Sequence, residues 1–275
     1  MHLLKLATSG ILGTLTVSGF IEREMNNIEV DNIEPVDMVS VIVPSFNEEP
    51  FIKKCLSSIR GQSIIQEYPQ YFEIILVDSN SKDKTVELGA PYVDKIINVR
   101  TRGKLTAKNL ATSLAQGNII VSADADTYYP PFWLGMLLRP FNDIYSPDYG
   151  NIAGVVGSTY DPHIPGVPAP LRNIAEILDR KIIHPNQMVG RNCAYYKHGF
   201  YLAGGLDETI NQLNVKEMIK EEEQGFGNRL AKLGKIAFRL NAVCLHLGGQ
   251  KIGCRLGTAN RDVCNNYGIS IERFG

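Results

Sequence analysis

The stretch that decides the fold class is Val39-Ser40-Val41-Ile42-Val43-Pro44-Ser45-Phe46-Asn47-Glu48-Glu49. Its first five residues form a nearly continuous β-branched run that Pro44 ends, as in a buried strand of a parallel sheet. Directly after it, apolar residues recur with the period of a helix between residues 50 and 62. This strand-then-helix order is the first unit of an α/β pattern.

The alternation of strands and helices continues to Val121. Further strands are predicted over 72–77, 95–99 and 118–122, and further helices over 83–90 and 106–115. The pattern predicts an α/β fold with a mostly parallel, Rossmann-like sheet flanked by helices on both faces. In such sheets, ligands bind beyond the carboxyl ends of the strands, so the residues that follow each strand are the candidate site.

Composition excludes several classes of protein. The net charge of −1 over 275 residues gives no case for nucleic-acid binding. The five cysteines are odd in number and none is paired at CxxC spacing, which argues against a zinc site or a secreted disulfide scaffold. We therefore expect reduced thiols and a cytoplasmic protein.

The N-terminal residues 3–21 are mostly apolar but are diluted by Gly, Ser and Thr. Three interpretations stay open: a weak signal peptide, an interfacial segment that makes peripheral membrane contact, or a segment packed on the main domain. Residues 161–170 carry four prolines and are predicted to form an irregular loop.

Two acids, Asp124 and Asp126, flank Ala125 just after a predicted strand. Carboxylates at this spacing can turn toward one hard cation, and Mg²⁺ or Mn²⁺ would take such oxygens together with phosphate oxygens. His246 ends a later apolar strand and is a candidate third ligand. The alternatives are two solvated loop acids and a structural histidine.

Three further loops carry polar residues that could bind a nucleotide. Asn47 and Glu48 follow the first strand and Asp78 follows the second, although helix capping explains such residues equally well. In the third loop, Gly103 permits close approach, and the positive N-terminal end of the helix predicted to follow suits a diphosphate beside Lys104. Lys108 lies one helical turn further on and is predicted to share a face with Lys104; the alternative is a solvated basic face.

Three consecutive acids, Glu221 to Glu223, are predicted to open a helix. Acids at a helix start favour the dipole, and a carboxylate at a cleft edge could also be a general base. Trp133 and the nearby aromatic residues form either an acceptor platform or part of the core.

Taken in order, these motifs resemble the family 2 glycosyltransferases, which have the GT-A fold. The resemblance is carried by the stretch quoted above and by the segments 77–85, 102–109, 123–126, 190–196, 204–208 and 222–234. It implies a nucleotide-sugar donor with UDP favoured, a Mn²⁺ or Mg²⁺ ion, and inversion at the anomeric carbon. The acceptor would be a glycan, a lipid-linked molecule or a protein.

The resemblance also implies residue roles. Asp126 and Asp124 would bind the metal and diphosphate, Glu223 would be the base, and Glu222 its reserve. The donor site would comprise Pro44, Ser45, Asn47, Glu48, Asp78, Asn80, Gly103, Lys104, Asn109, Asp124, Ala125 and Asp126. We expect an N-terminal extension over 1–37, a catalytic domain over 38–250 (a donor half to 127 and an acceptor half from 128), and a tail over 251–275.

Some features depart from the family pattern. Ser79 stands where a second acid often follows Asp78, and the second acid of the usual Glu-Asp pair is a glutamate. Neither a Gln-x-x-Arg-Trp segment nor a run of transmembrane helices follows, which favours a non-processive enzyme. A sugar-nucleotide nucleotidyltransferase and a non-catalytic nucleotide-sugar-binding module remain the alternatives, although the loop 44–48 lacks the glycines and bases of a nucleotidyltransferase.

Overall fold

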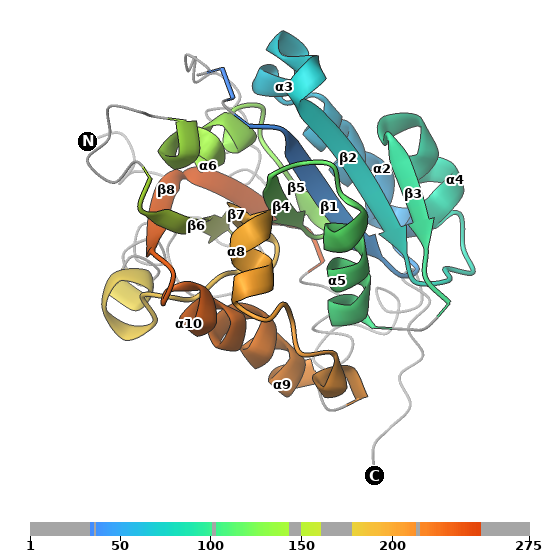
Figure 1. Ribbon diagram of the computed structural model, residues 1–275. Coiled ribbons are helices and arrows are strands. Elements are labelled where there is room, and N and C mark those ends of the chain that lie inside the picture. The colour runs from blue at the N-terminus through green and yellow to red at the C-terminus, as the bar shows by residue number, and fades with distance from the viewer. Residues whose placement is uncertain are drawn as a thin grey trace, which may run out of the picture.

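The computed structural model describes residues 34–35, 37–100, 103–142, 150–160, 178–212 and 215–248. Most of the predicted N-terminal extension, the proline-rich segment 161–170 and the C-terminal tail lie outside these ranges. The described residues form an eight-stranded sheet with the order β3-β2-β1-β4-β7-β6-β8-β5 (Figure 1). The strands are β1 (Val39–Ser45), β2 (Phe72–Asp78), β3 (Lys95–Asn98), β4 (Ile119–Ala123), β5 (Thr127–Tyr128), β6 (Ile152–Tyr160), β7 (Asn192–Tyr196) and β8 (Lys235–His246).

Strands β3, β2, β1 and β4 pair in parallel, and they are the four strands predicted from the β-branched runs. All seven residues of β1 and of β2 are buried, because helices cover both faces of the sheet. The predicted α/β fold with a mostly parallel sheet is therefore confirmed. Strand β7 then joins β4 in the antiparallel direction, and it extends the sheet to β6, β8 and β5.

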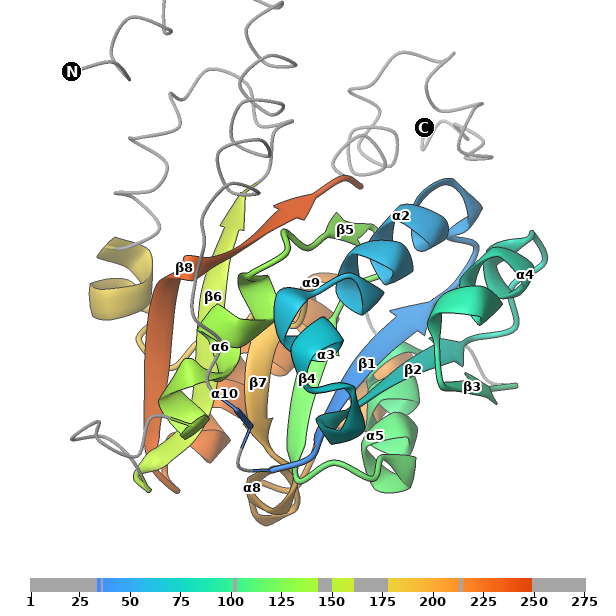
Figure 2. The same ribbon diagram turned by 90° about the horizontal axis from the view of Figure 1, so that it is seen from above.

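Helices pack on the two faces of the sheet in separate groups (Figures 1 and 2). One core contains Val39, Val41 and Val43 of β1 with residues of α2, α3 and α6. The other contains Ile42 with residues of α5, α8 and α10, so successive β1 residues face opposite sides as strand geometry requires. The helices are α2 (Glu49–Arg60), α3 (Ser63–Glu67), α4 (Thr85–Gly89), α5 (Lys104–Leu114), α6 (Trp133–Asn142), α8 (Lys197–Leu202), α9 (Val215–Lys220) and α10 (Phe226–Leu230).

The two predicted halves of the domain share one sheet. The boundary expected at residue 127 falls inside β5, whose Thr127 pairs with His246 at the end of β8. This antiparallel pairing brings the last residue of β8 to the loop that follows β4. None of the helices in the described ranges is long and apolar enough to cross a bilayer.

Candidate active site

The loops after β1 and β2 hold one another at the carboxyl edge of the sheet. The backbone N–H of Asn47 donates to the Ser81 hydroxyl at 2.9 Å, and the Asn47 side-chain oxygen accepts from the N–H of Lys82 at 2.8 Å. Asn47 adopts a positive φ of 53°, a conformation that asparagine tolerates better than most residues. The N–H of Glu48 donates to the Thr85 hydroxyl at 2.7 Å. Asn47 and Glu48 therefore fix the shape of the loop after β1 through these hydrogen bonds.

Asp78 is buried at the end of β2, beside Ser45 at the end of β1. Its carboxylate accepts from the Ser45 hydroxyl at 3.1 Å and from the Ser81 backbone N–H at 2.8 Å. Asn80 also has a positive φ, of 64°, and its side chain accepts from Lys82 Nζ at 3.0 Å. Pro44, Ser45, Asp78 and Asn80 thus lie together as predicted, and contacts within the protein account for the observed position of Asp78.

A network of opposite charges lies between β4 and α5. Lys104 Nζ lies 2.9 Å from Asp124 Oδ1 and 3.1 Å from Glu222 Oε2. Lys108 Nζ contacts the same Glu222 carboxylate and donates to the Ser122 hydroxyl and the Gly190 carbonyl, each at 2.7 Å. The two lysines therefore share a face of α5, as their spacing predicted. Lys108 is only 2% exposed, so this ammonium is a buried charge that depends on its partners.

Gly190 makes room for this network. A β-carbon at Gly190 would lie 2.1 Å from Glu222 Oε1, so any other residue would push the carboxylate away from Lys108. The glycine is required by this close approach rather than by its backbone angles.

The network keeps its carboxylates ionised. Burial by itself would raise the pKa of Asp124, but Lys104, Lys108 and Arg191 outweigh it and hold that pKa well below its usual range. Burial likewise opposes ionisation of Glu222, and the two lysines lower its pKa below the ordinary value. Burial by itself would lower the pKa of Lys104, but the carboxylates of Asp124 and Glu222 outweigh it and raise that pKa. The site therefore holds fixed charges of both signs at neutral pH.

Asp126 faces the last residue of β8. Its Oδ2 lies 3.5 Å from His246 Nε2, and a β-carbon at Gly248 would lie 2.1 Å from that same oxygen. Burial opposes ionisation of Asp126, yet the hydrogen bond and charge of His246 leave its pKa below the ordinary value. Strand pairing between β5 and β8 and the small Gly248 together set this geometry.

The Asp126–His246 pair fits a divalent cation. An ionised carboxylate and an imidazole are suitable ligands for Mn²⁺, and the 3.5 Å separation allows both to reach one ion at about 2.0–2.2 Å. Within the described ranges no group of three or more His, Cys, Asp or Glu residues forms a ready metal site. Two protein ligands would leave positions for phosphate oxygens and water. The observed carboxylate of Asp124 pairs with Lys104 instead.

The three acids do not open a helix, which corrects that expectation. They lie in a π-helical turn, Glu221–Gly225, that connects α9 directly to α10. Each carboxylate has its own partner: Glu221 pairs with Arg229, Glu222 with the two lysines, and Glu223 with Gln187. Buried ion pairing, rather than the helix dipole, accounts for Glu221 and Glu222. π-Turns of this kind occur often at functional sites.

Two residues of the predicted donor set have other contacts. The Asn109 side chain bonds to the backbone of Leu206 at 2.8 and 3.0 Å and to Glu208 at 2.8 Å, so it ties α5 to the turn after α8. Gly103 precedes α5 with a φ of 166°, an extended conformation that any residue can adopt. Ala125, between the two aspartates, is buried.

Arg191 was not among the site residues predicted from the sequence. Its Nε lies 3.8 Å from Asp124 Oδ2, and the side chain is within electrostatic range of Asp126 and Glu223. Its carbonyl accepts from the Tyr129 hydroxyl at 2.9 Å, and that hydroxyl also accepts from the Asp124 N–H. The rings of Tyr129 and Trp133 are in contact, with centroids 4.1 Å apart and planes tilted by 43°. Both side chains are buried, so these two aromatics belong to the core.

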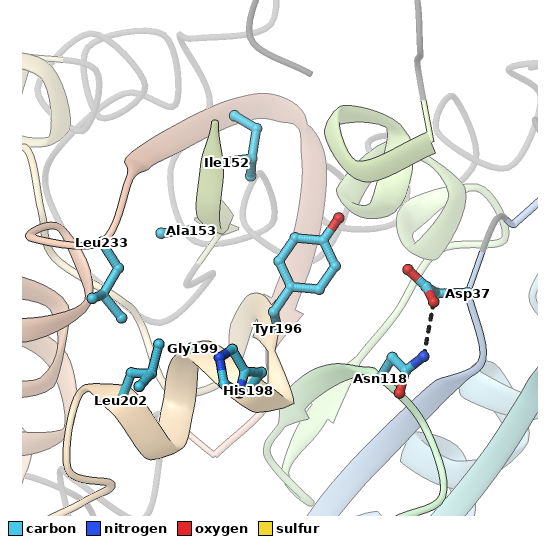
Figure 3. A pocket seen from close by; sticks show the side chains of 9 residues that line it. All are labelled: Asp37, Asn118, Ile152, Ala153, Tyr196, His198, Gly199, Leu202 and Leu233. Atoms are coloured by element: carbon cyan, nitrogen blue, oxygen red, sulfur yellow. Dashed lines mark hydrogen bonds between the residues drawn. The ribbon is translucent and has the colours of Figure 1, made fainter. Parts of the chain in front are cut away.

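A separate hollow of about 420 Å³ lies at the opposite edge of the sheet, near the starts of β1 and β4 (Figure 3). Asp37 and Asn118 bond across one side of it at 2.9 Å, and Leu202 and Leu233 line the other. None of the predicted site residues lines this hollow. The charged cluster at the carboxyl edge is therefore the better candidate for chemistry.

An α/β sheet with a carboxylate–imidazole pair, a buried lysine and a partly buried lysine at its carboxyl edge is the arrangement expected of a GT-A glycosyltransferase. Residues 40–196 match the family described as Glycosyl transferase family 2. Because the match extends over more than half of the 275 residues, the chain belongs to that family.

Curated relatives match over part of the chain. An undecaprenyl-phosphate 4-deoxy-4-formamido-L-arabinose transferase of Pseudomonas aeruginosa is 33% identical over 105 residues, which are 35% of this chain and 30% of the relative. A hyaluronan synthase of Pasteurella multocida is 28% identical over 128 residues, 44% of this chain and 13% of the synthase. The matched regions thus span a third or less of these relatives.

Solved structures share the fold. The mannosyltransferase PcManGT of Pyrobaculum calidifontis, solved with GDP-Man and Mn²⁺, has a TM-score of 0.60 at 20% identity. That alignment covers 92% of this chain and 71% of the mannosyltransferase. S. aureus TarS in complex with UDP-GlcNAc has a TM-score of 0.55 at 20% identity and covers 73% and 55% of the two chains. At these identities the likeness establishes the GT-A fold.

Proposed function

We propose that this chain transfers a sugar from a nucleoside diphosphate sugar to an acceptor hydroxyl, with inversion and with a bound divalent cation. The observation that carries the proposal is the Asp126–His246 pair at the carboxyl edge, two residues from Asp124, whose carboxylate faces Lys104 and Arg191. A diphosphate is recognised by such a combination of cations and metal ligands. Glu223 lies within electrostatic range of the same arginine.

Each group has a defined task in this reaction. Asp126 and His246 would hold Mn²⁺ or Mg²⁺, which neutralises the charge that develops on the leaving diphosphate. Lys104 and Arg191 place further positive charge beside that leaving group. Glu223 accepts the proton of the acceptor hydroxyl as its oxygen bonds to the anomeric carbon and the bond to the diphosphate breaks. Attack from the face opposite the leaving group inverts the configuration.

The donor and acceptor are proposed by class. The structures with GDP-Man and with UDP-GlcNAc show that proteins of this fold take sugars on different nucleotides, and we favour UDP. The relative named for undecaprenyl phosphate supports a lipid-linked acceptor, and hence peripheral membrane contact from the cytoplasmic side. The predicted acceptor loops over 160–187 and the tail after 249 lie largely outside the described residues.

Incubation of the chain with UDP-, GDP- and dTDP-sugars and Mn²⁺ should release nucleoside diphosphate from one class of donor, with water as the default acceptor. Asp126→Asn should lower the release rate roughly 100-fold, equivalent to about 3 kcal/mol of lost transition-state stabilisation. Arg60→Ala, which removes an exposed ion pair with Asp94, is the matched control and should leave the rate unchanged. Absence of release with every donor would exclude the proposed transfer.

A further inference from the structure

A short segment before β7, residues 186–190, runs along the π-turn that carries the acids. The backbone N–H of Met188 donates to the Glu223 carbonyl at 2.8 Å. At one end of the segment, a β-carbon on Gly227 would lie 1.9 Å from the Asn186 carbonyl oxygen. At the other end, a β-carbon on Gly190 would lie 2.1 Å from Glu222 Oε1. The two glycines let the segment and the turn approach more closely than side chains would allow.

Within this contact the side chain of Gln187 meets that of Glu223. Gln187 Nε2 donates to Glu223 Oε2 at 2.5 Å. Two neighbouring residues therefore bind Glu223: Gln187 bonds to its side chain, and Met188 bonds to its backbone. The Oε1 atom of Gln187 is buried and has no hydrogen-bond partner within the described ranges. The bond to Glu223 is therefore the polar contact that orients this amide.

Each of the three acids of the turn has polar partners, and those of Glu223 include the neutral side-chain amide of Gln187. A hydrogen bond from a neutral amide fixes the direction of a carboxylate and adds no charge of its own. It favours the ionised form, which is the form that accepts a proton. A catalytic group must be held within about 0.5 Å of its productive geometry by neighbours of this kind.

We propose that Gln187 is a positioning residue for Glu223, which it orients and keeps ionised for removal of the acceptor proton. The inference rests on the proposed role of Glu223. In this role Gln187 contacts Glu223 and does not contact the donor. Loss of the amide should therefore change turnover and its pH dependence and leave donor binding intact.

The test uses Gln187→Met, which keeps the length of the side chain, and Gln187→Glu, which adds a like charge. With the donor that the wild-type chain turns over fastest, both variants should lower kcat by about tenfold, with donor KM within about twofold. A hydrogen bond to a carboxylate favours its ionised form, so the acid limb of the pH–rate profile should move to higher pH. The shift should be larger for Gln187→Glu, by about one pH unit.

Gln224→Ala is the matched control, because Gln224 lies on the same turn and bonds instead to Asn228 at 2.8 Å. It should leave kcat and the acid limb unchanged. Gln187 variants with a wild-type kcat and acid limb, or with a raised donor KM at constant kcat, would overturn the inference. The variant Glu223→Gln separates the role of Glu223 as base from the role of Gln187 in positioning it. A fully active Glu223→Gln would overturn the role of Glu223. An inactive Glu223→Gln together with fully active Gln187 variants would overturn only the role of Gln187.

Discussion

Replacement of Glu223 by glutamine should lower kcat by about 10²–10⁴-fold, because the variant keeps the shape of the side chain but cannot accept the acceptor proton. Gln187 can still bond to the amide oxygen of the new side chain, so the π-turn should keep its geometry. Donor KM and Mn²⁺ affinity should change little, since the role proposed for Glu223 is to deprotonate the acceptor. Initial rates across a series of donor concentrations would separate these quantities.

The comparison variant is Glu87→Gln, an exposed acid on α4, which should have wild-type kinetics. Glu222→Gln addresses the reserve candidate for the base. Glu222 is 4% exposed and contacts both lysines, so its replacement should chiefly reduce stability. Near wild-type kcat for Glu223→Gln with a catalytically dead but folded Glu222→Gln would reverse the assignment.

Replacement of Lys108 by methionine should lower the free energy of unfolding by about 3–5 kcal/mol, because it leaves the buried carboxylate of Glu222 with one cation in place of two. For a chain of this size the loss corresponds to a fall in Tm of roughly 10 °C. Thermal unfolding at neutral pH would measure it. The double variant Lys108→Met with Glu222→Gln should recover much of the loss, since it removes both charges.

The pH dependence gives a second measurement of the same network. The pKa of Glu222 is lowered in the folded chain, so the stability it contributes is present at neutral pH and is lost as the pH falls through that lowered pKa. The difference in Tm between the wild type and Lys108→Met should therefore shrink in acid. A constant difference from neutral to acid pH would show that lost packing, rather than lost charge pairing, explains the effect.

The parallel half of the fold was predictable because its first two strands are nearly continuous apolar runs, broken only by Ser40 and Glu73. Residues 39–43 and 72–77 could not be solvated strands, and each is followed by a loop and a helical period. The same logic located the carboxyl-edge loops, including Asn47, Asp78 and Asp126. It also placed Lys104 and Lys108 on one helix face, as their contacts with Glu222 confirm.

The remaining contacts depend on packing between distant segments. Lys108 and Glu222 are 114 residues apart, and no local period indicates that they form one pair. The acids at 221–223 have the pattern of a helix start, and only the packed structure shows that they lie inside a continuous helical stretch. Gln187 and Arg191 lie in a segment without strand or helix periodicity. The only indication of Arg191 in the sequence was its place in the Gly190-Arg191-Asn192 stretch, one of the segments that carry the family resemblance.

The most direct test of the account is the position of nucleotide and metal in crystals grown with UDP and Mn²⁺. We predict an anomalous manganese peak bonded to Asp126 and His246, with the diphosphate beside Lys104 and the nucleoside against the loops after β1 and β2. Nucleotide bound instead in the hollow beside Asp37 and Asn118, or bound at the carboxyl edge with manganese away from Asp126, would contradict it.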